Sequence, residues 1–175
     1  MKNVSRLLPL LSGIVTLSGC SHAPQKSNGQ NNQKPNIIYI FADDLGIGDL
    51  SCYGATKVST PNIDRLAGQG VQFTNAYATS ATSTPSRFGL LTGMYPWRQE
   101  NTGIAPGNSE LIIDTTCVTM ADMLKDAGYA TGAVGKWHLG LGPKGETDFN
   151  NRITPNAQSI GFDYEFIIPA TVDRV

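Results

Sequence analysis

The order of apolar and polar segments along the chain constrains its fold more than any other feature. An apolar run of β-branched and aromatic residues at 36–41 ends in Asp43 and Asp44, as a buried strand does where it reaches a loop. The expected elements are strands at 36–41, 71–78 and 129–135, and helices at 61–69, after Pro85 and around 118–127. This alternation predicts an α/β fold, with a mainly parallel sheet that has helices on both faces.

Residues typical of helix boundaries support the three helices. Thr60 is a typical N-cap, Pro61 follows it at the first helical position, and Gly70 ends the segment. Gly93 and Gly128 are expected to close the second and third helices in the same way.

Composition limits the kinds of protein that this chain can be. With 175 residues, 40% of them hydrophobic, it has material for the core of one globular domain. The formal net charge is -1 and neither sign forms a block, so the sequence lacks the basic footprint of a nucleic-acid-binding protein and we expect no nucleic-acid partner. Cys52 and Cys117 fit either a disulfide in an oxidising compartment or two free thiols.

The first 34 residues indicate export and anchoring. Residues 1–19 have a basic start, an apolar middle and small residues at the end, as a secretory signal peptide does. Leu17-Ser18-Gly19-Cys20 resembles a bacterial lipobox, which implies cleavage before Cys20 and a lipid on its thiol; an ordinary signal peptide that contains a cysteine is the alternative. Residues 20–34 form a polar tether. We expect a protein held at the membrane by its lipid alone, in the bacterial cell envelope, facing the periplasm rather than exposed on the surface.

Three polar clusters follow the predicted strands. They are Asp43-Asp44, the segment from Ser83 to Arg87, and Lys136-Trp137-His138. In parallel α/β sheets, ligands bind beyond the carboxyl ends of the strands. The sequence therefore predicts that the three clusters converge at one edge of the sheet.

Each of the first two clusters can be interpreted in two ways, as part of a binding or catalytic site or as a purely structural feature. Adjacent carboxylates at Asp43 and Asp44 suit a hard cation such as Ca²⁺ or Mg²⁺, although either can also cap a turn. Ser83 lies just before Pro85, near a predicted helix N-terminus that favours negative charge, and Arg87 is placed to hold an oxygen or an anion there. The alternative for Ser83 is a plain N-cap.

The third cluster pairs a cation with a proton carrier. Lys136 and His138 are two residues apart, so an extended strand end places them on one face. A solvated lysine and a structural histidine are the alternative. Trp97 and Trp137 are expected in the core.

The residues around Ser83 carry a family resemblance. Ser83-Thr84-Pro85-Ser86-Arg87, three residues and then Leu-Thr-Gly ending at Gly93 match the signature of the formylglycine-dependent sulfatases, in the alkaline-phosphatase-like superfamily. Further segments that resemble this family in the same order lie at residues 35–54, 60–77, 128–140 and 161–166. The resemblance implies a sulfuric ester hydrolase that acts on sulfated carbohydrates or small aryl sulfate esters.

The resemblance also implies a modified residue and a metal. Ser83 would be converted to Cα-formylglycine (3-oxoalanine), and because the precursor is serine, the enzyme that converts it would be a radical-type sulfatase-maturating enzyme. One hydroxyl of the hydrated aldehyde would attack sulfur, and the other would drive the release of sulfate. Asp43 and Asp44 would bind one Ca²⁺ together with an oxygen of the modified Ser83.

The remaining assignments concern the cations and the histidine. By resemblance, Arg87 would stabilise the formylglycine hydrate, Lys136 would contact the sulfate and the nucleophile, and His138 would assist the proton transfers of the hydrate. This much positive charge fits sulfuryl transfer, which like phosphoryl transfer depends on positioning and electrostatic stabilisation.

The family pattern also needs metal ligands and a general acid that this sequence does not supply. We therefore expect residues 35–175 to be the incomplete N-terminal part of a sulfatase catalytic domain, inactive by itself. Two other readings stay open: a phosphonate or phosphate ester hydrolase of the same superfamily, and a truncated lipoprotein without catalytic activity.

Overall fold

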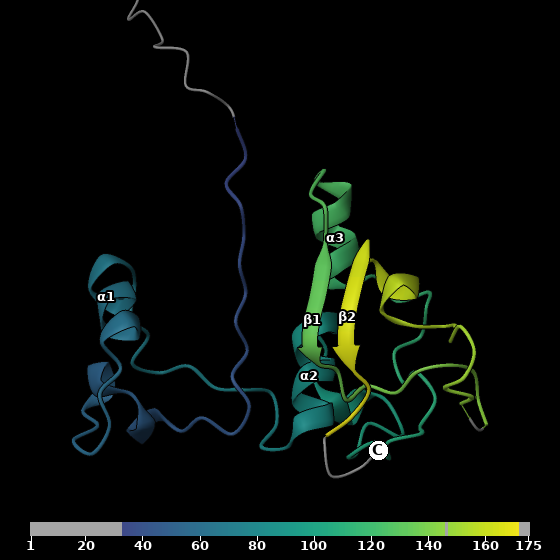
Figure 1. The fold of residues 1–175 in the computed structure, drawn as a ribbon, viewed down its shortest axis with the longest axis horizontal. Coiled ribbons are helices and arrows are strands. Elements are labelled where there is room, and N and C mark those ends of the chain that lie inside the picture. Colours follow the sequence, from purple (N-terminus) through teal and green to yellow (C-terminus); the bar gives the residue numbers. More distant parts are fainter. Residues whose placement is uncertain (1–32, 146, 172–175) are drawn as a thin grey trace, which may run out of the picture. The chain divides into compact units, whose positions relative to one another are not determined.

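The computed structural model describes residues 33–145 and 147–171 (Figure 1). The chain divides into two units, one ending at Phe41 and the other beginning at Ala42. The elements, all in the second unit, are η1 (Ile47–Asp49), η2 (Ser51–Tyr53), α1 (Pro61–Gln69), α2 (Ser83–Thr92), η3 (Pro96–Arg98), α3 (Met120–Asp126), β1 (Gly132–Lys136), η4 (Ala157–Ile160) and β2 (Tyr164–Ile168).

The strands β1 and β2 lie side by side and run parallel (Figure 1). Their register places Lys136 opposite Ile168. Beyond the ladder, the main-chain N–H of His138 still donates to the carbonyl oxygen of Pro169 at 2.9 Å. The predicted strand at 129–135 is thus present, but it begins three residues later and ends one residue later than predicted. The pairing with β2 fixes the exit of the chain from this strand, where the third polar cluster lies.

Two predicted strands are not formed. Residues 36–41 are extended but pair with no strand in the described part of the chain, and Ile38 and Ile40 are 84% and 83% exposed. Residues 71–78 contain bends and are exposed as well. A strand exists only with a hydrogen-bonded neighbour, which an apolar pattern does not supply by itself. The prediction of strands at these two places is therefore wrong for this structure.

The first two predicted helices are present. In α1, Thr60 is the N-cap, Pro61 the first residue and Gly70 the C-cap, as predicted. Helix α2 begins at Ser83, ahead of the expected start after Pro85, and ends at Gly93 in the left-handed conformation, with φ of 67°. Ser83 is thus the first residue of a helix of 10 residues.

The third helix differs from the prediction at both ends. Thr119 caps its N-terminus, because its hydroxyl accepts the main-chain N–H of Asp122. The threonine with an acidic residue three positions later is a sequence signal of such a cap. At the other end, α3 stops at Asp126 with Ala127 as C-cap, one residue earlier than the predicted Gly128.

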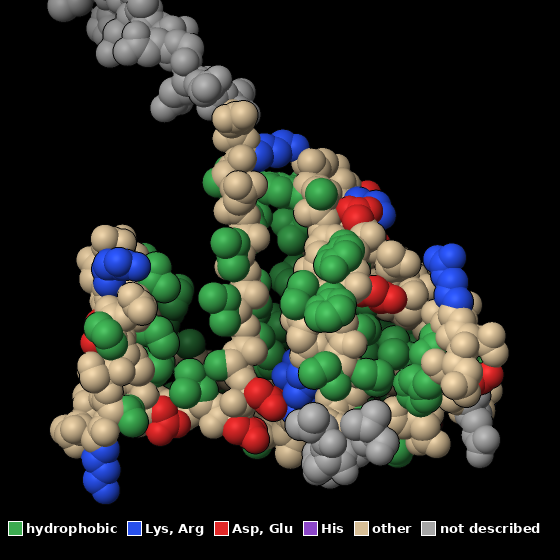
Figure 2. Space-filling model, in the orientation of Figure 1, with side chains coloured by type: hydrophobic (Ala, Val, Ile, Leu, Met, Phe, Trp, Pro, Cys, Tyr) green, Lys and Arg blue, Asp and Glu red, His purple; other side chains and the backbone are tan. Residues whose placement is uncertain are grey.

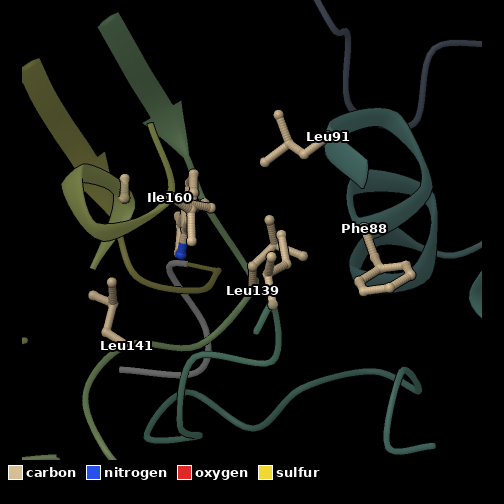
Figure 3. Close-up of a cluster of buried hydrophobic side chains, with 8 residues drawn as sticks. Phe88, Leu91, Leu139, Leu141 and Ile160 are labelled. Atoms are coloured by element: carbon tan, nitrogen blue, oxygen red, sulfur yellow. The ribbon is translucent and has the colours of Figure 1, made fainter. Parts of the chain in front are cut away.

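A small apolar core joins α2 to the segment after β1. Figure 3 shows Phe88 and Leu91 on α2, with Leu139, Leu141 and Ile160 from later in the chain. Phe88 is fully buried and Leu139 and Ile160 are 1% exposed. This packing seats α2 next to the exit from β1, which brings the second and third polar clusters together.

The two tryptophans differ in burial. Trp137 is buried in the core and its indole N–H donates to the carbonyl oxygen of Gly140 at 2.8 Å. Trp97 is exposed and stacks on Tyr95, with ring centroids 4.1 Å apart, so the prediction that it lies in the core is wrong.

Hydrophobic side chains cover the strands on the face that Figure 2 shows. Val134 of β1 and Tyr164 and Phe166 of β2 are exposed. A two-stranded sheet buries little surface by itself, and a core of this size needs further elements to become independently stable.

The predicted leader lies outside the described residues. This concerns the signal peptide at 1–19, the lipidation site Cys20 and nearly all of the tether at 20–34. In the described part of the chain, no helix has the length and apolar character of a membrane span. Cys52 and Cys117 are free thiols.

Candidate functional site

The start of α2 places Ser83 and Arg87 one turn apart on the same side of the helix. Residues four apart on a helix are neighbours. The Nε of Arg87 donates to Oγ of Ser83 at 3.1 Å. Thr82, the N-cap, makes no side-chain cap hydrogen bond with the helix N-terminus where Ser83 lies. Partial positive charge at this end of the helix favours an anion there.

The guanidinium of Arg87 connects three segments of the chain. Besides Ser83, it binds the carbonyl oxygen of Lys136 through Nη1 at 2.7 Å and Oδ1 of Asp43 through Nη2 at 3.1 Å. The Arg87 side chain is only 11% exposed. A planar fork with several donors can make these bonds at once, which a single ammonium group cannot.

Lys136 and Asp43 form the second ion pair of the cluster. The Nζ of Lys136 donates to Oδ1 and Oδ2 of Asp43 at 3.0 and 2.8 Å. The hydrogen bond from Lys136, with that from Arg87 and the charges of both, lowers the pKa of Asp43 below its ordinary value, against a smaller opposing effect of desolvation. Asp43 therefore stays ionised, with its carboxylate between two cations.

The structure brings four of the predicted site residues together. Asp43, Ser83, Arg87 and Lys136 come from three distant parts of the sequence and are joined by the hydrogen bonds above. The predicted convergence at the exit from β1 is present. It does not depend on a strand before Asp43, because side-chain ion pairs hold this residue.

Asp44 takes no part in this cluster. Its φ of 54° is left-handed, and its carboxylate makes no hydrogen bond or ion pair with any other residue that the structure describes. The backbone changes direction at Asp44, and the two adjacent carboxylates therefore have different surroundings. Asp43 is bound by two protein cations, whereas Asp44 has no side-chain partner among the described residues.

The described residues fit a calcium ion in the type of their donors but not in their number. Asp43 and Asp44 offer carboxylate oxygens, which a hard cation prefers. Across residues 33–145 and 147–171, however, no group of three or more His, Cys, Asp or Glu side chains could hold a metal ion. Ca²⁺ takes about 6–8 oxygen ligands. The described residues alone therefore do not complete a calcium site.

His138 differs from its prediction. Its φ of 55° is left-handed, so the chain is no longer extended there and the predicted shared face with Lys136 is not formed. The side chain is buried, and Nε2 lies 3.0 Å from the carbonyl oxygen of Ala105, while the ammonium of Lys136 binds Asp43.

Two residues near the site were missed by sequence reasoning. Ala105 holds the imidazole of His138 through its carbonyl oxygen, and Thr84 hydrogen-bonds both Ala105 and His138. A contact through a main-chain carbonyl oxygen cannot be predicted from the residue type, because every residue has this group. Thr84 occupies the position of the signature at which any residue is allowed.

The sequence of this chain is similar to those of known proteins. The profile of the protein family described as Sulfatase matches residues 35–172. The chain is 90% identical over all of its 175 residues to N-acetylgalactosamine-6-O-sulfatase of Bacteroides thetaiotaomicron, and spans 34% of that protein. It is 50% identical over 115 residues to arylsulfatase A of Homo sapiens, covering 63% of this chain and 22% of the relative. The chain thus spans about a third or less of these curated relatives.

Solved structures are similar as well. One, from work on the metabolism of multiple glycosaminoglycans by Bacteroides thetaiotaomicron, matches with a TM-score of 0.80 and 94% identity, over 82% of this chain and 30% of that one. Another, in complex with its substrate D-glucosamine-2-N,6-O-disulfate, matches with a TM-score of 0.53 and 39% identity, over 61% of this chain and 21% of that one. These similarities confirm the predicted α/β fold class.

Proposed function

Because this chain belongs to the sulfatase family, we propose that the full-length protein hydrolyses sulfate esters of carbohydrates. The observation that carries the proposal is the guanidinium of Arg87, which joins Ser83, Asp43 and Lys136 in one cluster of alternating charge. Such a cluster is suited to an anionic group, because fixed donors stabilise charge that develops on oxygen.

The proposed substrate carries a 6-O-sulfate on N-acetylgalactosamine. Support comes from the relative of this name, which is 90% identical over the whole of this chain. Recognition of the sugar itself would involve residues beyond the described cluster, since the chain spans only 34% of that relative. Small aryl sulfates would serve as test substrates.

We propose that Ser83 is converted to Cα-formylglycine by a radical-type sulfatase-maturating enzyme. The site fits this group: the oxygen on Cβ of Ser83 receives a hydrogen bond from Arg87, at the N-terminus of a helix. When hydrated, the group supplies a hydroxyl that attacks sulfur and a second hydroxyl that allows sulfate to leave. Thr84 and the three residues after it are buried in α2, so the maturating enzyme would act before this helix packs.

The other residues position and neutralise charge. Arg87 holds the oxygen of residue 83 and, through its bond to the carbonyl oxygen of Lys136, keeps the end of β1 in place. Lys136 supplies a second positive charge, which its ion pair with Asp43 orients. His138 would carry protons in this scheme.

We also propose that the full-length enzyme binds one Ca²⁺. Asp43, Asp44 and the oxygen of residue 83 would contribute to it, and further acidic ligands would come from the rest of the protein. The free carboxylate of Asp44 and the ionised state of Asp43 support this assignment.

Mass spectrometry combined with product analysis tests the proposal on the full-length protein from its native host. We expect the Ser83 peptide to be lighter than unmodified serine by about 2 Da, the mass of two hydrogens. We also expect release of sulfate from a 6-O-sulfated N-acetylgalactosamine and much slower release of phosphate from the matching phosphate ester. Unmodified serine in folded protein, or preferred release of phosphate, would contradict the sulfatase mechanism.

We further propose that Cys20 carries a lipid that anchors the protein in the cell envelope, facing the periplasm. The lipobox-like sequence that ends at Cys20 supports this. Cys20→Ser is expected to move the full-length protein from the membrane fraction to the soluble fraction and to abolish its labelling by a fatty acid. Cys52→Ser is the matched control and should leave both unchanged. Membrane attachment that survives Cys20→Ser would refute the anchor.

A further inference from the structure

Thr84 lies at the centre of a closed hydrogen-bonded network next to the proposed nucleophile. Its hydroxyl donates to the carbonyl oxygen of His138 at 2.9 Å and accepts the main-chain N–H of Ala105 at 3.0 Å. The side chain is fully buried. The hydroxyl donates one hydrogen bond and accepts one, so each of these two contacts has a defined donor and acceptor.

Ala105 extends the network to the ring of His138. Its carbonyl oxygen lies 3.0 Å from Nε2 of His138, in a buried environment. A carbonyl oxygen only accepts, so Nε2 must carry the proton of this bond. In the neutral imidazole, Nδ1 is then the basic nitrogen. The position of Ala105 thus sets both the orientation and the tautomer of His138.

The backbone of His138 needs such support. Its φ of 55° is a conformation that residues other than glycine rarely adopt, and it persists only where the surroundings enforce it. The hydroxyl of Thr84 binds the carbonyl group of this same residue. Thr84 therefore holds His138 twice, directly at the backbone and through Ala105 at the imidazole.

We propose that Thr84 is a positioning residue of the sulfatase reaction, which fixes the imidazole of His138 for proton transfer. This inference rests on the proposed function and adds a residue to it. Because Thr84 directly follows Ser83 on α2, one rigid helix turn connects the nucleophile position to the histidine support. The hydroxyl, rather than the size of the side chain, carries this role.

The experiment compares variants of the full-length, matured enzyme on a small fluorogenic sulfate ester. Thr84→Val keeps the shape and removes the hydroxyl, whereas Thr84→Ser keeps the hydroxyl. Thr102→Val is the matched control, because Thr102 is also buried and its hydroxyl donates to the carbonyl oxygens of Pro96 and Gln99, which are not part of the network around His138. The turnover number is divided by the formylglycine content of each preparation, measured by mass spectrometry.

We expect Thr84→Val to lower kcat by about tenfold to a hundredfold with little change in KM, the effect of a misplaced catalytic group. Thr84→Ser and Thr102→Val should stay close to wild type. In a His138→Ala background, Thr84→Val should cause no further loss, because two changes in one pathway are not additive.

Three results would overturn the inference. These are an unchanged kcat in Thr84→Val, an equal loss in Thr84→Ser, and a full additional loss in the His138→Ala background. Thr84→Ser is a mild change, so it gives an answer even where Thr84→Val does not fold. A fully converted wild type without sulfatase activity would instead refute the proposed function, and the inference with it.

Discussion

Ser83→Ala in the full-length protein is expected to abolish the hydrolysis of sulfate esters, with a loss in kcat of about 10⁴-fold or more. Alanine has no oxygen on Cβ, so it can neither be converted to formylglycine nor accept the hydrogen bond from Nε of Arg87. The neighbouring cations Arg87 and Lys136 cannot replace a missing nucleophile. The measurement is sulfate release under saturating substrate, with the melting temperature recorded beside it.

Two further variants make this result specific. Thr82→Ala is the matched control: Thr82 is the N-cap of α2, is exposed and makes no side-chain cap hydrogen bond, so its kcat should stay within about twofold of wild type. Ser83→Cys introduces cysteine, which the family signature also allows at this position. This variant should be active in a host whose maturating enzyme converts cysteine. Activity in Ser83→Ala near the wild-type level would show that another residue is the nucleophile.

The sequence predicted the meeting of the charged residues better than it predicted the sheet. Asp43, Arg87 and Lys136 were expected at one edge because parallel strands end together. Among the described residues only β1 and β2 are strands, and yet the three side chains meet. Ion pairs between them, together with the packing of α2 on the segment after β1, hold the cluster. The alkaline-phosphatase-like α/β fold class, expected from the alternation and the signature, agrees with the similar solved structures.

The parts that sequence reasoning missed involve the backbone. Whether residues 36–41 pair as a strand depends on a neighbour, not on their own apolar pattern. The left-handed φ of His138 cannot be read from a histidine, because only its surroundings enforce it. The hydrogen bond from Thr84 to the carbonyl oxygen of His138 joins residues 54 positions apart in the sequence. Because every residue has a main-chain carbonyl group, the residue type does not identify this partner. No pattern of residue types predicts such contacts.

Arg87→Lys is expected to lower kcat by about a hundredfold to a thousandfold, the cost of losing a fixed donor to a developing charge. The guanidinium binds Ser83, the carbonyl oxygen of Lys136 and Asp43 at the same time. The ammonium of lysine keeps the charge but lacks the planar fork, so it cannot serve the three partners together. The carbonyl oxygen of Lys136 would lose its donor, at a cost in stability of about 1 to 3 kcal/mol.

The matched control is Arg98→Lys, because Arg98 is exposed in η3 and the same exchange there should change neither kcat nor the melting temperature. A wild-type kcat in Arg87→Lys, at normal formylglycine content, would mean that charge alone suffices at this position. A loss of stability without a loss of kcat would make Arg87 a structural link between α2 and β1. Only the combined loss, with Arg98→Lys unaffected, fits a guanidinium that both holds the oxygen of residue 83 and keeps the end of β1 in place.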